Sequence, residues 1–141
     1  DKIVIVQKYI RGRELTCGVM GNAGDKKLLA LPVVEIIADG EFFDYHNKYF
    51  SKTVKEICPA KISDKLSEKI QEYSKKIHRT IGCDGLTRSD FILSKDKKIY
   101  FLEINTIPGQ TEASLCPKEA KAAGIPFDNF LEMQIKLALE K

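Results

Sequence analysis

The sequence lacks the features that would assign it to several specialised classes of protein. No apolar run approaches the roughly 20 residues that a membrane-spanning helix needs, and no secretory signal peptide opens the sequence. The formal net charge is only +3, and no arginine-rich run occurs, so nucleic-acid binding is not indicated. We therefore expect neither a membrane nor a nucleic acid as a partner.

Cysteines are few and widely spaced. The four thiols, Cys17, Cys58, Cys83 and Cys116, form no Cys-x-x-Cys pair and have no histidine cluster nearby. A zinc site is therefore not indicated. Because 141 residues suffice for an ordinary hydrophobic core, disulfide cross-links are not needed. We expect reduced thiols in a cytoplasmic protein.

The start of the chain has its own implication. A β-branched run begins at Ile3, directly after Asp1 and Lys2, without a preceding methionine. A strand at this position has no earlier segment to pair with, so we expect the chain to be a fragment of a longer protein.

Hydrophobic periodicity predicts an α+β domain with a largely antiparallel sheet flanked by helices. We expect strands over 3–10, 14–20, 28–37, 87–94 and 99–105, with Pro32 weakening the third, and helices over 63–82, 118–123 and 126–140. Between 39 and 59 periodicity disappears, which is typical of a lid or binding loop.

The helices should bury one face each. In the first, the expected buried residues are Leu66, Ile70, Tyr73, Ile77 and Ile81, with Ser63 and Gly82 as caps and His78 partly exposed without a catalytic role. In the last helix they are Phe127, Phe130, Leu131, Ile135 and Ala138.

Two neighbouring strands carry charges at matching positions. If Asp96 and Lys97 form a two-residue turn, Asp90 lies opposite Glu103 and Arg88 opposite Asn105. Two carboxylates across a ladder repel each other, and oxygen ligands of this kind suit magnesium and phosphate. We therefore predict a magnesium-nucleotide site at Asp90, Glu103 and Asn105. Strand alternation also predicts that Ile99 and Phe101 lie on the same face as Glu103 and Asn105.

The alternative without a functional site is that these charged residues lie on a solvent-exposed face of the sheet. Against it, Tyr100 to Asn105 is otherwise apolar on both faces, and charges in buried strands are usually paired or bound to metal. The turn that follows, 106–111, is rich in backbone donors, and Gly109 lets the main chain approach a ligand closely.

Four motifs in order resemble those of the D-alanine–D-alanine ligases, within the ATP-grasp superfamily. Residues 103–111, Glu-Ile-Asn-Thr-x-Pro-Gly-x-Thr, resemble the family signature, and residues 82–90, Gly-Cys-Asp-Gly-x-x-Arg-x-Asp, the segment before it. Residues 44–49, Asp-Tyr-x-x-Lys-Tyr, resemble the mobile ω-loop, and residues 7–14, Gln-Lys-Tyr-Ile-x-Gly-Arg-Glu, the adenine hinge. The resemblance covers almost the entire chain.

The resemblance implies the C-terminal ATP-grasp domain and a role for each matching residue. Asp90, Glu103 and Asn105 would hold two magnesium or manganese ions. For the nucleotide, the resemblance implies that Gln7, Lys8, Tyr9 and Ile10 bind the adenine, that Glu14 binds the ribose and that Lys48 contacts the γ-phosphate. Arg88 and Gly109 would stabilise the tetrahedral intermediate. The second D-alanine would be bound by Ser114, Leu115, Tyr45 and Tyr49.

Two residues depart from the family pattern. Gln7 stands where the hinge usually has glutamate, and Gln110 where an apolar residue is usual. The resemblance also implies that an N-terminal substrate domain and a central ATP-grasp subdomain, which carry the phosphate-gripping lysines, lie outside this chain.

These observations favour a cytoplasmic, ATP-dependent ligase that joins two D-alanines for peptidoglycan precursors, and the family's enzymes are commonly homodimers. The 141 residues alone would be inactive. Two alternatives stay open: a ligase joining D-alanine to D-lactate or D-serine, and a non-catalytic nucleotide-binding module. The ester-forming relatives generally lack the tyrosine-lysine-tyrosine loop, so Tyr45, Lys48 and Tyr49 favour the amide product.

Overall fold

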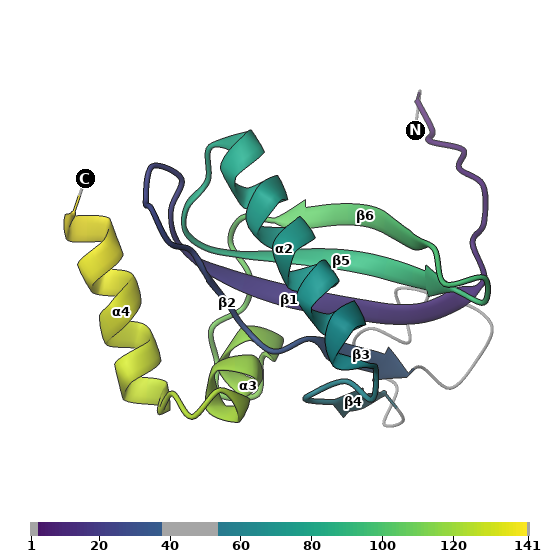
Figure 1. Ribbon diagram of the computed structural model, residues 1–141. Helices are drawn as coiled ribbons and strands as arrows, with labels where there is room; N and C mark the ends of the chain where they lie inside the picture. Colours follow the sequence, from purple (N-terminus) through teal and green to yellow (C-terminus); the bar gives the residue numbers. More distant parts are fainter. Residues whose placement is uncertain (1–2, 38–53, 141) are drawn as a thin grey trace.

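The computed structural model describes residues 3–37 and 54–140, which form one antiparallel sheet with helices packed against it. The sheet has the strand order β4 (Lys55–Ile57), β3 (Val34–Ile37), β1 (Gly12–Asn22), β5 (Asp84–Ser94) and β6 (Ile99–Asn105), with β2 (Leu29–Ala30) also paired to β1. Helix α2 (Asp64–Ile81) crosses one face, while α3 (Leu115–Ala122) and α4 (Phe127–Leu139) lie at the other side of the sheet (Figure 1). The predicted α+β class is confirmed, and no helix in the described part is both long and apolar enough to cross a bilayer.

The central strands β1 (Gly12–Asn22) and β5 (Asp84–Ser94) pair along their entire length. Because side chains alternate along a strand, β1 sends Leu15 and Cys17 toward α2 and Met20 toward α3 and α4. The remaining positions on the second face, Glu14, Thr16 and Gly18, lie beside Ile92, Asp90 and Arg88 of β5. The two central strands therefore separate the core under α2 from a second face, which carries the polar residues beside the core formed with α3 and α4.

Helix α2 (Asp64–Ile81) begins and ends where the sequence predicts. Ser63 is its N-cap residue, and Gly82 takes the left-handed conformation, with φ of 74°, that glycine adopts without steric cost. The predicted buried face is confirmed in part, since Ile70 is buried and Leu66 and Ile77 pack against the core. Ser74 and His78 are also fully buried, while Tyr73 is 40% and Ile81 54% exposed.

The prediction of a partly exposed His78 is wrong. Its imidazole is buried between α2 and the sheet, with Nδ1 2.8 Å from the hydroxyl of Thr87 and Nε2 3.1 Å from the carbonyl of Gly21. Burial lowers the pKa of His78, which favours the neutral ring. Both ring nitrogens have partners, so the polar group is accommodated inside the core.

The predicted strand over 3–10 is also wrong. These residues are irregular, and Ile3, Val4, Ile5 and Val6 are each at least 74% exposed. A β-branched run forms a strand only where a neighbouring strand satisfies its backbone groups, and no described strand pairs with it.

The predicted third strand is divided in two. β2 (Leu29–Ala30) and β3 (Val34–Ile37) lie on either side of Pro32, which has no N–H for a ladder. Both pair with β1. Most of the predicted loop 39–59 lies outside the described residues, but its end forms β4 (Lys55–Ile57), paired with β3, which corrects the expectation of an irregular segment there.

The hairpin of β5 and β6 (Ile99–Asn105) reaches the predicted pairing by a different route. Its turn closes from Ser94 to Lys98, one residue longer than expected, and Lys97 adopts a φ of 61°. A bulge between Asp90 and Phe91 then restores the register, so Asp90 lies opposite Glu103 and Arg88 opposite Asn105, as predicted.

The bulge changes which side chains of β6 share a face. Phe101 lies opposite Phe91, and Ile99 opposite Leu93, so both belong to the α2 face rather than to the face of Glu103. β6 is also the last strand of the sheet, and Phe101 and Leu102 are about half exposed, at 46% and 53%. The expectation that this strand is buried on both faces is therefore wrong.

The C-terminal helices close the second core. α3 (Leu115–Ala122) begins three residues earlier than predicted, and α4 (Phe127–Leu139) lies where predicted. Phe130 is fully buried, with Phe127 and Leu131 packed beside it. Ile135, at 61%, and Ala138 are exposed, which contradicts their predicted inward orientation.

Candidate functional site

Arg88 and Asp90 form the best-defined polar contact of the predicted site. They stand two residues apart on β5 and therefore point to the same face. The guanidinium donates two hydrogen bonds to the carboxylate, Nε to Oδ1 at 2.9 Å and an Nη to Oδ2 at 2.8 Å. This contact raises the pKa of Arg88 further, so the positive charge is permanent.

A threonine that the sequence analysis missed completes this contact. The hydroxyl of Thr16 on β1 donates to Oδ1 of Asp90 at 2.5 Å. Thr16 lies directly opposite Asp90 in the ladder, and its position two residues after Glu14 on the same face is the signal that could have identified it. Three donors thus fix the orientation of the Asp90 carboxylate.

Glu103 offers a second carboxylate across the ladder. The Glu103 side chain is exposed, and within the described residues it makes no hydrogen bond or salt bridge. Asn105 accepts a 3.0 Å hydrogen bond from the N–H of Ile107 through Oδ1, which ties its amide to the following turn.

These residues fit a magnesium ion by the chemistry of their donors. Asp90 and Glu103 are hard oxygen donors on one face, and like charges held directly opposite each other favour a cation between them. The set has two carboxylates and one amide. Across residues 3–37 and 54–140, no three His, Cys, Asp or Glu side chains gather into a group able to hold a metal by themselves.

Glu14 lies on the same face as Asp90. It pairs with Ile92 across β1 and β5, and burial, together with the charge of Asp90, raises its pKa. Of the other predicted nucleotide contacts, Gln7, Lys8 and Tyr9 are exposed and Ile10 is half-buried in the irregular segment before β1. The structure therefore brings Glu14 to the site and leaves the hinge residues outside the sheet.

The loop before α3 gathers the remaining predicted residues. Ser114 Oγ accepts from the N–H of Thr111 at 3.2 Å and lies 2.9 Å from its hydroxyl. A side chain at Gly109 would come within 2.9 Å of the same Oγ, so glycine permits this close approach. Ser114 is the N-cap residue of α3 and Leu115 is its first residue, where helix N–H groups favour an anion. Lys48, Tyr49 and Tyr45 lie outside the described residues.

A buried acid behind the site was not predicted. Glu119 of α3 is fully buried; its Oε2 accepts from the N–H of Gly18 at 2.7 Å, and its Oε1 has no partner. Gly18 lies between the pairings of β1 with β2 and β3, where Pro32 interrupts the ladder. The Glu119 carboxylate thus accepts a hydrogen bond from the Gly18 N–H, which has no strand partner because the ladder is interrupted between β2 and β3. The spacing of Cys116, Glu119 and Ala120 on one helix face is the signal that could have placed it inside.

Glu119 should make stability depend on pH. Burial raises its pKa to about 8, so between its ordinary value and pH 8 the folded state binds more protons than the unfolded state, and stability falls as pH rises. The slope due to this one group is at most about 1.4 kcal/mol per pH unit.

Denaturant unfolding from pH 5 to pH 8 measures this effect. Relative to Glu119→Gln, which cannot ionise, the unaltered protein should lose stability steadily over the range. The lowered pKa of His78 acts in the opposite sense but is common to both proteins. Parallel stability curves would show that Glu119 does not titrate in this range.

Comparisons with known proteins agree with the motifs. Residues 1–136 match the family model described as D-ala D-ala ligase C-terminus. A D-alanine–D-alanine ligase of Desulfotalea psychrophila is 46% identical over 98% of this chain and 42% of its own length. That of Syntrophobacter fumaroxidans is also 46% identical, over 99% of this chain and 44% of its own. The chain thus spans less than half the length of these relatives.

Solved structures show the same fold. The VanG D-Ala:D-Ser ligase of Enterococcus faecalis superposes with a TM-score of 0.80 at 36% identity, over 92% of this chain and 37% of that one. The D-alanine–D-alanine ligase of Bacillus anthracis, complexed with ATP, gives 0.75 at 32% identity, over 95% of this chain and 40% of that one. With its motifs in family order and its fold shared, the chain belongs to the D-alanine–D-alanine ligase family and corresponds to its C-terminal part.

Proposed function

We propose that the protein acts as an ATP-dependent ligase that joins two D-alanines through a D-alanyl phosphate, and that this chain carries the magnesium, nucleotide and second-substrate part of the site. The observation that carries the proposal is the pairing of Asp90 with Glu103 beside Arg88. Family membership supports the reaction class, since the matched relatives are ligases by name.

The family resemblance, together with the chemistry of the side chains, assigns a task to several described residues. Asp90, Glu103 and Asn105 are the oxygen donors for two Mg²⁺ or Mn²⁺ ions, which when bound neutralise charge on the transferring phosphoryl group. Thr16 and Arg88 hold Asp90 in a fixed orientation. Glu14 binds the ribose, and the backbone of Lys8 to Ile10 the adenine, with Gln7 accepting from its amino group.

The second half of the reaction needs an oxyanion site. A carboxylate first takes the γ-phosphoryl group of ATP; an amine then attacks the acyl phosphate, and phosphate leaves. Arg88 and the N–H of Gly109 stabilise the charge on the tetrahedral intermediate. Ser114 and the N–H of Leu115 hold the carboxylate of the second D-alanine, where α3 begins.

The remaining parts of the proposal rest on the family resemblance. Lys48 reaches the γ-phosphate, and Tyr45 and Tyr49 shape the second-substrate site as the ω-loop closes. Exclusion of water protects the acyl phosphate from hydrolysis. We place the whole protein in the cytoplasm as a homodimer that supplies peptidoglycan precursors, with the N-terminal and central domains outside this chain.

Assays of the full-length protein test the proposal. With Mg·ATP and D-alanine we expect phosphate release coupled to dipeptide formation. Glu103→Ala should abolish magnesium-dependent turnover, whereas Glu68→Ala, at an exposed position of α2, should leave it unchanged. Unaltered turnover of Glu103→Ala would overturn the metal assignment.

D-serine is the strongest competing second substrate, because a solved D-Ala:D-Ser ligase has a TM-score of 0.80 with this chain. Parallel assays with D-alanine, D-serine and D-lactate at neutral pH separate the three products. Preference for D-serine or D-lactate would replace the dipeptide proposal. Absence of turnover with any of them, together with Mg·ATP binding by calorimetry, would indicate a nucleotide-binding module.

A further inference from the structure

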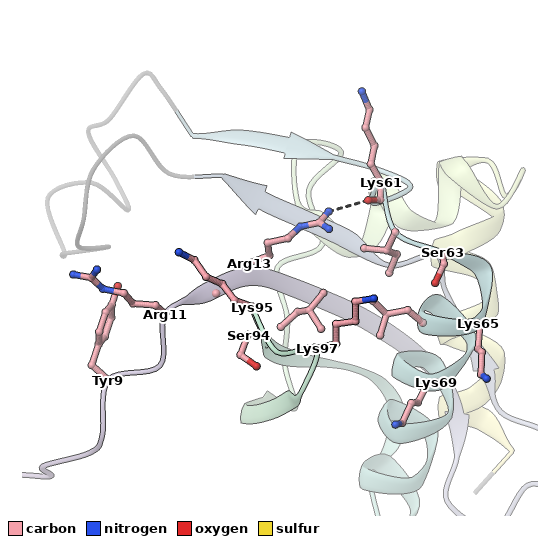
Figure 2. Close-up of a pocket in the computed structure, with 14 residues that line it drawn as sticks. Tyr9, Arg11, Arg13, Lys61, Ser63, Lys65, Lys69, Ser94, Lys95 and Lys97 are labelled. Carbon is pink, nitrogen blue, oxygen red and sulfur yellow. Dashed lines mark hydrogen bonds between the residues drawn. The ribbon is translucent and has the colours of Figure 1, made fainter.

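One hollow in the described part of the chain lies away from the predicted magnesium residues. It has a volume of about 1250 Å³ and is bounded by the start of β1, the first turns of α2 and the β5–β6 turn (Figure 2). Its sheet residues Arg13 and Leu93 are paired and belong to the α2 face. Asp90 and Arg88 belong to the other face, so the two sites are separated by the sheet.

The hollow is lined by cations. Seven lysine and arginine side chains surround it, and no aspartate or glutamate does. Arg13 is neutralised by Glu35, with 2.6 and 2.7 Å hydrogen bonds. Within residues 3–37 and 54–140 the other six have no salt-bridge partner; they are Arg11, Lys61, Lys65, Lys69, Lys95 and Lys97.

Asp96 and Asp64, which are close in sequence to the lining lysines, do not line the hollow. Asp96, within the β5–β6 turn, binds Lys98 at 3.0 Å and the hydroxyl of Ser94 at 2.5 Å. Asp64 stands in the first turn of α2 but does not line the hollow. Since the whole chain has a net charge of only +3, six cations without a salt bridge at one hollow are a local excess of positive charge, which a multiply charged anion would relieve.

The start of α2 adds donors to the same place. Ser63, its N-cap residue, lines the hollow, and its side chain makes no capping hydrogen bond. In the first turn the N–H of Leu66 donates to the carbonyl of Ser63 at 2.9 Å, and the N–H groups before it, which have no partner within the helix, lie at its positive dipole end. Figure 2 shows Lys65 and Lys69 on this helix, Lys95 and Lys97 on the β5–β6 turn, and Arg11 before β1.

We propose that this hollow binds a small anion that carries a chain of two or three phosphates, independently of the magnesium site. A volume of about 1250 Å³ exceeds what one phosphate ion fills. The cations come from three separate segments, so an extended anion can meet several at once. Lysine suits such a ligand, because its flexible ammonium acts as a point charge toward phosphate.

Calorimetric titration of the full-length protein with inorganic tripolyphosphate tests the proposal. EDTA is present, so that binding through a metal at Asp90 and Glu103 cannot contribute. We expect saturable binding, weakened at least tenfold by Lys95→Glu with Lys97→Glu. The matched control, Lys26→Glu with Lys27→Glu, makes the same charge change at exposed lysines outside the hollow, and we expect less than a twofold effect.

A second pair of changes guards against a local folding defect. Lys65→Glu with Lys69→Glu reverses the charge on the opposite wall and should weaken binding by a similar factor, with unfolding midpoints checked for every variant. Absence of saturable binding, or equal weakening in the control pair, would overturn the proposal, since the latter indicates a response to net charge alone. Binding of a single-stranded oligonucleotide without any binding of tripolyphosphate would also overturn it.

Discussion

Arg88→Ala should lower kcat of the full-length protein in the proposed reaction by about 10²- to 10³-fold, the usual effect of removing one donor from an oxyanion site. Arg88 is the side chain that both orients Asp90 and offers positive charge to the tetrahedral intermediate in the proposed reaction. Phosphate release at saturating ATP and D-alanine measures the change. Arg88→Lys should recover little, because an ammonium cannot reproduce the two parallel hydrogen bonds.

The control for this change is Arg79→Ala. Arg79 lies on α2 and donates to the carbonyl of Asp25 at 2.9 Å, away from Asp90. The Arg79→Ala substitution removes the same type of side chain from the opposite side of the sheet. We expect its kcat to stay within about twofold of that of the unaltered protein. Thermal unfolding separates catalysis from stability, since removal of Arg88 also leaves Asp90 without its ion pair. Equal kcat values for the two variants would refute the role of Arg88.

Phe91→Ala should destabilise the protein by about 3–5 kcal/mol, the range for truncating a buried aromatic side chain. Phe91 is 1% exposed and packs with Leu15, Cys17 and Ile70 in the core under α2. The loss combines the apolar surface returned to water with the cavity left between sheet and helix. Denaturant unfolding followed by far-UV circular dichroism measures it.

Phe101→Ala is the matched control. Its ring centroid lies 5.8 Å from that of Phe91, but Phe101 is 46% exposed on the last strand of the sheet. The same atoms are removed, yet less surface is lost from the interior and a smaller cavity remains. We expect a loss of about 1 kcal/mol. Equal losses of unfolding free energy for Phe91→Ala and Phe101→Ala would contradict the exposure of Phe101 and mean that another part of the protein covers β6 in solution.

Local chemistry made several elements predictable. Ser63 and Gly82 mark the ends of α2 because a cap residue and a left-handed glycine satisfy backbone groups that the helix leaves free. The pairing of Asp90 with Glu103 was predicted from strand alternation. That success depended on two errors that cancel, since the turn is one residue longer than assumed and the bulge compensates for it.

The sequence by itself determined the family motifs, the α+β class and the single face shared by Arg88, Asp90 and Glu103, because alternation and capping depend on residues close in the chain. Only the tertiary structure decided the rest. Residues 3–10 form no strand, since no strand in the described part of the chain pairs with them. His78, Thr16 and Glu119 acquire their partners from distant segments. Burial and hydrogen bonding depend on packing between elements, which periodicity along one element does not encode.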